Sequence, residues 1–385
     1  MNRSSHILLT GGRAPVAVDL GRMLAKQGYT VHVADSLRYY MSQGSNIFAS
    51  SSVISPPSRN LNHFAADLNG IIKEKGIDVI IPTCEEVLYL AKIRGQLPEG
   101  IECFFDDFDK LLGLHSKHDF INFCQIHRFA IKAPRTKLVK NLQEIIDFQK
   151  EVGDIIIKAT YSRFSSNIYI KPSMEDLKKI AFQDSNPWLA QEYINGTEYA
   201  SYSIAKHGQV IATSVYTPEY RMGLASATFF RPKLHPKVEA FTKQIVAKLG
   251  YHGHIAFDFI EKGDDLFVIE CNPRMNSGFH LIADKLDFSQ VLTSQQLTPF
   301  IIKSESQRAK KFAAMMPFCL GDQKRSTKKI LEDFSNSEDV LWQRSDPLPI
   351  IWALWTYLFY FIKSLFSGTT LHYECSHDSE WNGDY

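Results

Sequence analysis

The chain has 385 residues, of which 44% are hydrophobic and 22% are charged. This length exceeds what one compact core usually holds, so we expect two or three domains. Its 43 Lys and Arg residues balance 42 Asp and Glu residues, which argues against a protein built mainly to coat nucleic acid or an anionic membrane. Six cysteines without a C-x-x-C pair, and an N-terminus without a secretory signal, indicate a cytoplasmic protein with reduced thiols.

The first part of the chain alternates short apolar strands with an amphipathic helix. Strands are expected at residues 7–10, 29–34 and 79–82, and a helix is expected at 16–27. This order predicts a parallel, doubly wound α/β sheet, which we place at residues 1–112.

Polar residues follow the strand at 79–82, at the edge where parallel sheets bind ligands. Glu85 or Glu86 can hold a substrate amine there, or can act at the N-terminus of the next helix. A Gly11–Gly12–Arg13 turn follows the first strand, but it lacks the full G-x-G-x-x-G dinucleotide pattern. An NAD-dependent oxidoreductase is therefore kept only as a minor alternative.

The middle of the chain mixes hairpins with helices, which predicts α+β sheets. Short strands at 155–158 and 167–171 flank a polar loop at 160–166, and further strands are expected at 188–192, 198–205 and 209–216. An amphipathic helix at 236–249 precedes two last strands, at 253–261 and 266–272.

The last two strands predict a cluster of polar side chains. Side chains alternate faces along a strand, so Glu270 and Asn272 share one face. If Lys262 and Leu266 close the turn, Asp258 lies directly opposite Glu270. Two carboxylates this close need a neutralising cation, and oxygen ligands suit Mg²⁺, with Mn²⁺ as an alternative. The competing interpretation, two ordinary exposed acids, is weakened by the apolar residues around them. Arg274 is placed to hold charge on a transferred phosphoryl group.

The segment Glu270–Cys271–Asn272–Pro273–Arg274 resembles the E-x-N-P-R signature of the ATP-grasp superfamily, which includes carbamoyl-phosphate synthetase, biotin carboxylase and D-alanine–D-alanine ligase. The resemblance implies that Asp258, Glu270 and Asn272 bind magnesium and that Arg274 contacts the reacting phosphate or acyl group. It also implies a Rossmann-like pre-ATP-grasp domain before an α+β ATP-grasp domain.

Further matches occur in the order that this family implies. Lys117 opens a helix and would reach the nucleotide phosphates, and Lys158 ends the strand whose lysine binds the α- and β-phosphates and takes part in catalysis. The following loop would close over the nucleotide with Ser162 at a phosphate, although this loop contains no glycine. The segment 188–198 resembles the adenine hinge, in which Gln191, Glu192 and Ile194 line the purine and Glu198 accepts from the ribose hydroxyls.

The acceptor substrate is expected to meet residues on either side of the helix at 236–249. By the same resemblance, Arg221 and Arg231 are candidate carboxylate clamps. Asn276 and Ser277 follow the signature and could contact an acyl phosphate, while Glu85 remains a candidate for a substrate amine.

The C-terminal region is predicted to hold a polar, exposed stretch at 324–345 and then an aromatic-rich hydrophobic helix. The uncharged run at 348–362 is shorter than the roughly 20 residues needed to span a bilayer. A stretch at 348–366 can dock on the body of the protein, form a dimer contact, or lie shallowly in a membrane. Docking is the first expectation, and the domains are placed at 1–112, 113–302 and 303–385.

Together these features predict an ATP- and Mg²⁺-dependent ligase that activates a carboxylate as an acyl phosphate for attack by an amine or other nucleophile. Its partners would be small molecules, not nucleic acid. The main alternative is a nucleotide-binding regulator or scaffold that keeps the fold without turnover.

Overall fold

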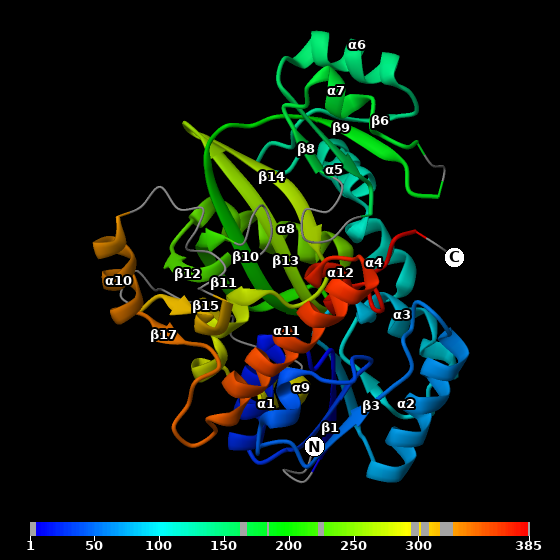
Figure 1. Cartoon of the computed structure of the whole chain (residues 1–385), viewed down its shortest axis with the longest axis vertical. Coiled ribbons are helices and arrows are strands. Elements are labelled where there is room, and N and C mark those ends of the chain that lie inside the picture. Colours follow the sequence, from blue (N-terminus) through cyan, green and yellow to red (C-terminus); the bar gives the residue numbers. More distant parts are fainter. Residues whose placement is uncertain are drawn as a thin grey trace.

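The computed structural model describes residues 5–161, 168–182, 185–221, 227–293, 300–301, 308–315 and 326–383. Three sheets organise these residues (Figure 1). In the view of Figure 1 a small sheet lies at the top, a large sheet lies in the middle, and a parallel sheet built from the N-terminal residues lies below.

The N-terminal sheet is parallel throughout, as the sequence predicts, in the order β3-β2-β1-β4-β5. Its strands are β1 (His6–Thr10), β2 (Thr30–Asp35), β3 (Ser50–Val53), β4 (Val79–Pro82) and β5 (Glu102–Cys103). The intervening helices are α1 (Pro15–Lys26), η1 (Met41–Gly44), α2 (Leu61–Lys75), α3 (Glu86–Lys92) and η2 (Arg94–Gln96). Because the chain continues from β1 to one side and returns at β4 on the other, the carboxyl ends of β1 and β4 form the switch point at which such sheets bind ligands.

Two helices, α4 (Phe108–His115) and α5 (Lys117–His127), lead to the small sheet. The expected domain boundary at residue 112 falls inside α4. The small sheet has the antiparallel order β6-β9-β7-β8. Its elements are β6 (Thr136–Val139), α6 (Leu142–Val152), β7 (Ile155–Ala159), β8 (Ile168–Ile170), α7 (Met174–Leu177) and β9 (Trp188–Glu192). Its own apolar core includes Ile145, Phe148 and Ile157.

The large sheet has the order β14-β13-β10-β11-β12-β16-β17, with β15 paired to β11. Its strands are β10 (Thr197–Lys206), β11 (Gln209–Arg221), β12 (Ala227–Lys233), β13 (Gly253–Lys262), β14 (Asp265–Asn272), β15 (Phe300–Ile301), β16 (Lys310–Lys311) and β17 (Glu338–Asp339). Three short helices follow β14: η3 (Ser277–Leu281), η4 (Ala283–Lys285) and α9 (Phe288–Thr293).

Helix α8 (Pro236–Leu249) covers one face of the large sheet. The ring of Phe241 packs edge-on against Phe257 and Phe259, at centroid distances of 5.3 and 5.8 Å. Alternation along β13 therefore sends Asp258 to the opposite face. The apolar packing under the hairpin fixes the direction of its polar side chains.

The C-terminal part of the chain returns to the N-terminal sheet. It contains α10 (Thr327–Ser335), α11 (Leu348–Ser367) and α12 (Leu371–Ser376). Arg22 of α1 binds Asp346 at 2.9 Å, and Val340 and Leu341 are buried. The expectation that 324–345 is an exposed polar stretch holds for most of its described residues, and Asp333, Val340 and Leu341 are the buried exceptions among them.

Helix α11 docks only one of its faces, so the first expectation for 348–366 describes half of the helix. Ala353 and Tyr360 are buried in a core cluster that also contains residues of β1, β2 and the large sheet. The helix is long and apolar enough to cross a membrane by length and composition, which is weak evidence by itself.

Candidate active site

The β13–β14 hairpin brings two carboxylates face to face. Asp258 pairs with Glu270, as the sequence predicts, although the turn is one residue tighter than expected and closes with Lys262 opposite Asp265. A β-bulge at Ile269 absorbs the difference, because Phe259 pairs with Val268 while Asp258 pairs with Glu270. The predicted pairing is confirmed although the predicted turn was wrong.

Asn272 lies against both carboxylates. Its Nδ2 is 3.4 Å from Asp258 Oδ2 and 3.3 Å from Glu270 Oε1. In this arrangement the amide donates to the acids and relieves their repulsion. A half-turn of the amide would instead present Oδ1, giving three oxygen donors on one patch. Within the described ranges no group of three or more His, Cys, Asp and Glu side chains could hold a metal, so a cation here would draw further ligands from phosphate or water.

Two buried lysines face this patch from other elements. Lys117 is 5% exposed and begins α5, where Ser116 caps the helix by accepting from Asp119 N at 3.2 Å. The Phe120 ring stacks on Phe257 at 5.9 Å and joins the start of α5 to the hairpin. Lys158, 3% exposed, lies on β7. Lys117 begins a helix and Lys158 lies on a strand, as expected, while their contact with phosphate stays a prediction.

The charges in this cluster perturb one another. Burial lowers the pKa of Lys158 to about 8, although Glu270 and Asp258 partly oppose this effect. Burial alone would raise the pKa of Glu270, but the positive charges of Lys117 and Lys158 outweigh it and hold that pKa well below its usual value. Glu270 is therefore held in its ionised form beside concentrated positive charge.

Arg274 connects the hairpin to the parallel sheet. Its Nη2 donates to Asn272 Oδ1 at 3.0 Å, and its Nε lies 3.6 Å from Glu85 Oε1. Glu85 is 1% exposed and follows β4 at the switch point. The predicted substrate residue Glu85 thus lies beside the predicted catalytic residue Arg274, although the two come from different sheets.

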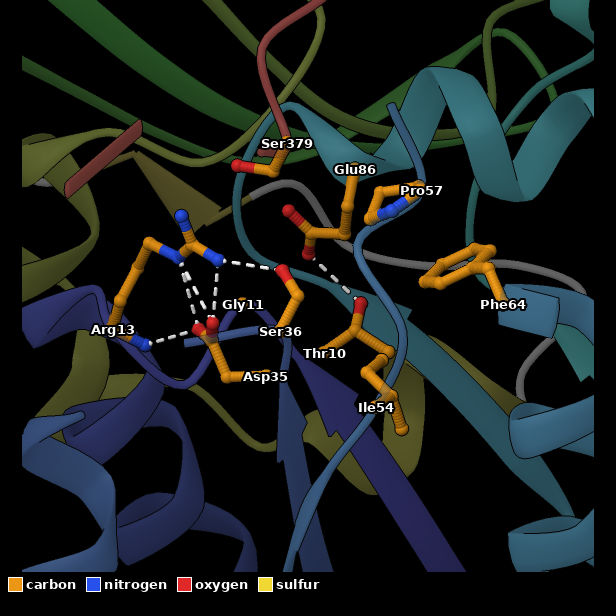
Figure 2. A pocket seen from close by; sticks show the side chains of 10 residues that line it. All are labelled: Thr10, Gly11, Arg13, Asp35, Ser36, Ile54, Pro57, Phe64, Glu86 and Ser379. Carbon is orange, nitrogen blue, oxygen red and sulfur yellow. Dashed lines mark hydrogen bonds and ion pairs between the residues drawn. The ribbon is translucent and has the colours of Figure 1, made fainter. Parts of the chain in front are cut away.

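Glu86 has a different role from Glu85. Its Oε1 accepts from Thr10 Oγ1 at 2.8 Å (Figure 2). It also accepts from the backbone N–H groups of Thr83 and Cys84 at 3.1 and 3.2 Å. Burial raises its pKa, although these hydrogen bonds partly oppose the rise. Glu86 therefore ties the end of β4 to the end of β1, and no side chain among the described residues caps the N-terminus of α3 as the alternative had it.

A small pocket lies at the carboxyl edge of β1 and β2. Figure 2 shows Arg13 directed at Asp35 and Ser36, with Ser379 of the C-terminal segment above them. Arg13 binds Asp35 and Asp378 at 2.5 Å each. The segment after α12 therefore covers the ligand edge of the parallel sheet, a contact that no local pattern of residues predicts.

The residues predicted to bind the base and the ribose lie on β9, on the link from β9 to β10 and at the start of β10. Gln191 is buried and donates to Thr136 Oγ1 at 3.0 Å. The backbone N–H of Glu192 donates to Arg135 O at 2.8 Å. Ile194 is buried, and Glu198 is exposed at the start of β10. Ser162 lies outside the described residues.

The remaining substrate candidates are not brought to this cluster by any contact in the described residues. Arg231 is held by Glu219 at 2.9 Å and Asp333 at 3.1 Å, and its use as a carboxylate clamp stays a prediction. Asn276 caps η3 by accepting from Gly278 N, and its Nδ2 donates to Ser201 O. Ser277 begins η3, and Arg221 ends β11 with a side chain outside the described set.

One residue near the cluster was missed. His115 is buried, stacks on Tyr161 at 5.8 Å and interacts electrostatically with Glu85, Lys117 and Arg274. Burial lowers its pKa to about 4. Its place two residues before Lys117 was the signal available in the sequence.

Comparison with known proteins agrees with this geometry. Residues 123–278 match the family model described as ATP-grasp domain. Mitochondrial carbamoyl-phosphate synthase [ammonia] of Aquarana catesbeiana is 26% identical over 174 residues, which cover 41% of this chain and 12% of the relative. The carbamoyl phosphate synthase large chain of Clostridium perfringens is 26% identical over 224 residues, covering 54% of this chain and 19% of the relative. The chain thus spans only a small part of these relatives.

Two solved structures share the fold over most of their length. N5-carboxyaminoimidazole synthetase from Staphylococcus aureus, complexed with ADP, has a TM-score of 0.60 at 15% identity and covers 77% of this chain and 79% of that one. L-amino acid ligase from Bacillus licheniformis has a TM-score of 0.57 at 14% identity and covers 80% of this chain and 79% of that one. The chain therefore shares the ATP-grasp fold, and its residues 123–278 are similar to an ATP-grasp domain, as its segment at 270–274 predicts.

Proposed function

We propose that this protein is an ATP- and Mg²⁺-dependent ligase that activates a carboxylate as an acyl phosphate for attack by an amine or another nucleophile. The observation that carries the proposal is the convergence of Asp258, Glu270 and Asn272 with the buried ammonium groups of Lys117 and Lys158. An acidic patch facing buried cations suits a polyphosphate with its divalent ion, because each component neutralises another.

The residues of the patch would divide the work by charge. Asp258, Glu270 and the turned amide of Asn272 would hold Mg²⁺, which when bound neutralises phosphate charge and orients the phosphates. Lys117 and Lys158 would bind phosphate oxygens from the opposite side, at no further desolvation cost because they are already buried.

Arg274 is the residue best placed to act on the transferred group. Its guanidinium is held by Glu85, 3.6 Å from Nε, and by the backbone carbonyl of Met275, which accepts from Nη1 at 3.2 Å. Turning the Asn272 amide towards Mg²⁺ would break its bond to Arg274 Nη2 and free that nitrogen for the transferred group. A planar guanidinium fixed in this way would stabilise the charge that develops as the acyl phosphate forms. When the nucleophile attacks the acyl carbon, inorganic phosphate would leave and would stay bound to the same guanidinium.

The nucleotide would lie between the small and the large sheets. In this proposal the base meets Gln191, Glu192 and Ile194, partly through backbone groups, the ribose hydroxyls donate to Glu198, and Ser162 serves the phosphates. A carboxylate suits two vicinal hydroxyls because it only accepts hydrogen bonds at neutral pH.

The parallel sheet, as a Rossmann-like domain at residues 1–112, would supply substrate contacts in this proposal. Glu85 is then the candidate for binding the substrate amine. The amine and Arg274 would compete for the carboxylate of Glu85. We place the ligase in the cytoplasm, acting on small molecules, within a domain division of 1–112, 113–302 and 303–385.

The proposal is tested by phosphate release and product mass over a panel of carboxylic acids and amines, with ATP and Mg²⁺. Glu270→Gln and Lys158→Met should abolish acid-dependent phosphate release while the variants stay folded. Lys150→Met is the matched control, because this lysine lies on exposed α6 and should leave turnover unchanged. Normal turnover in folded Glu270→Gln would contradict the assignment. ATP binding without turnover for any acid would favour the regulator.

A further inference from the structure

Helix α11 carries its most apolar face outward. Nine large apolar side chains on this helix are between 45% and 89% exposed, and they make up half of the eighteen exposed large apolar residues in the described part of the chain. They are Leu348, Ile351, Leu354, Trp355, Leu358, Phe361, Ile362, Leu365 and Phe366. At about 100° per residue these nine fall within a sector of about 140° along the whole helix. We call this sector the outer face of α11.

The opposite face is the less apolar one, yet it is the face that is buried. Its buried residues are Pro349, Ala353, Thr356, Tyr360 and Ser364. A surface helix of a soluble protein normally shows the reverse distribution, with its apolar stripe against the core. The inversion indicates that the outer face has an apolar environment of its own.

The helix is held firmly in this orientation. The Trp352 ring packs so closely on Gly44 that a Cβ at Gly44 would overlap it. The rings of Tyr39 and Phe359 meet edge-on at 4.8 Å. Lys363 binds Glu374 of α12 at 2.7 Å. The outer face is therefore presented by a docked helix and is not a frayed end.

The outer face is large for a single surface feature. From the exposed fractions, its nine side chains present on the order of 1,000 Å², whereas the largest apolar patch of a typical monomer is roughly 300–600 Å². In Figure 1 the helix runs across the N-terminal part of the molecule. To cover an apolar area of this size, a partner must contact the outer face of α11 along the whole length of the helix.

We propose that the outer face of α11 binds an anionic membrane, with the helix lying in the plane between headgroups and acyl chains. A second copy of the helix would cover mainly the line along which two helices cross, whereas a bilayer surface covers the whole sector at once. The docked face keeps the helix from spanning the bilayer, although its 20 residues would be long enough to do so.

The charges around the helix favour anionic lipid. Residues 348–367 contain no Asp or Glu. Exposed Arg344 precedes the helix, and exposed Arg38 adjoins Tyr39, whose ring also meets Trp355 at 6.1 Å. Two arginines at the rim of an apolar face are suited to lipid phosphates and anionic headgroups. The balanced charge of the whole chain had argued against a membrane-coating protein, and it does not conflict with one local contact.

This proposal is independent of the ligase activity, because none of its residues lies in the active site. The test is flotation of the full chain with vesicles of phosphatidylcholine alone, or with about 30% phosphatidylserine. Binding is expected with the anionic vesicles and should weaken between about 0.1 and 0.5 M NaCl. The triple variant Leu354→Gln, Leu358→Gln, Leu365→Gln should bind at least ~100-fold more weakly. The double variant Arg38→Ala, Arg344→Ala should lose about 30-fold, and only for the anionic vesicles.

A matched control is Val53→Gln, Ile126→Gln, Leu331→Gln, which removes three apolar side chains that are 55% to 65% exposed elsewhere and should bind as the parent does. The thermal midpoint of the first triple variant must stay near that of the parent, since its residues are exposed. Absence of flotation, or equal flotation of both triple variants, would overturn the proposal. Sedimentation as a dimer that only the α11 variant dissociates would overturn it in favour of a second copy.

Discussion

Trp381 provides the sharpest test of how the C-terminal segment is held. This side chain is 1% exposed and packs against Tyr89 at 5.0 Å and Phe108 at 5.3 Å, with the Lys92 ammonium 5.2 Å from its ring. Truncation of a buried Trp to Ala usually costs about 3–5 kcal/mol, and these ring contacts place Trp381→Ala in the upper part of that range. The variant should lower the thermal midpoint by about 5 °C or more.

The matched control for this experiment is Trp342→Ala, because Trp342 is 54% exposed and its loss should change the midpoint little. The assay is thermal and urea unfolding of both variants, followed by far-ultraviolet circular dichroism. Since His115 hydrogen-bonds the backbone of Trp381 and lies beside Lys117, we also expect Trp381→Ala to weaken ATP binding. An unfolding free energy within about 1 kcal/mol of the parent would refute the inferred packing of this segment.

Three further predictions concern other parts of the fold. Arg13→Ala leaves the buried carboxylate of Asp35 without its main cation and should cost about 3–5 kcal/mol in urea unfolding, while Arg13→Lys recovers only part. Burial alone would raise the pKa of Glu374, but its ammonium and hydroxyl partners lower it to about 2, below the unfolded value. Its contribution, up to about 3 kcal/mol, is therefore complete above about pH 4.5 and lost as the pH falls towards 2, a dependence that Glu374→Gln should remove from an acid titration. Gly44→Ala should displace Trp352 and expose α11 to limited proteolysis, with a destabilisation of about 1–3 kcal/mol.

Much of the site could be predicted because its residues lie at fixed places on regular elements. The alternation along β14 placed Glu270 and Asn272 on one face, and the order of motifs placed Lys117 and Lys158 on the helix and strand that reach them. Even so, Asp258 lies opposite Glu270 only because two departures from the predicted hairpin offset each other. A tighter turn and a bulge at Ile269 cancel, and neither has a clear sequence signal.

The rest could not be predicted because it depends on contacts between distant parts of the chain. Arg13 and Asp378 are separated by 365 positions, and Arg22 and Asp346 by 324. Local patterns carry no information about such pairs. For the same reason Arg231 looked available in the sequence, whereas Asp333, 102 positions later, holds it in place.

The return of the C-terminal segment to the first sheet has a consequence for synthesis of the chain. The last strand of that sheet ends at Cys103, but Trp381, which packs on its helices, is translated 278 residues later. At roughly 5–20 residues per second, the ribosome needs about 15–55 s to make that stretch. During this interval the nascent N-terminal residues expose Tyr89 and Phe108, and Arg13 lacks its second partner, Asp378. We therefore expect this part of the chain to be a target for chaperones until the segment around Trp381 emerges and covers it.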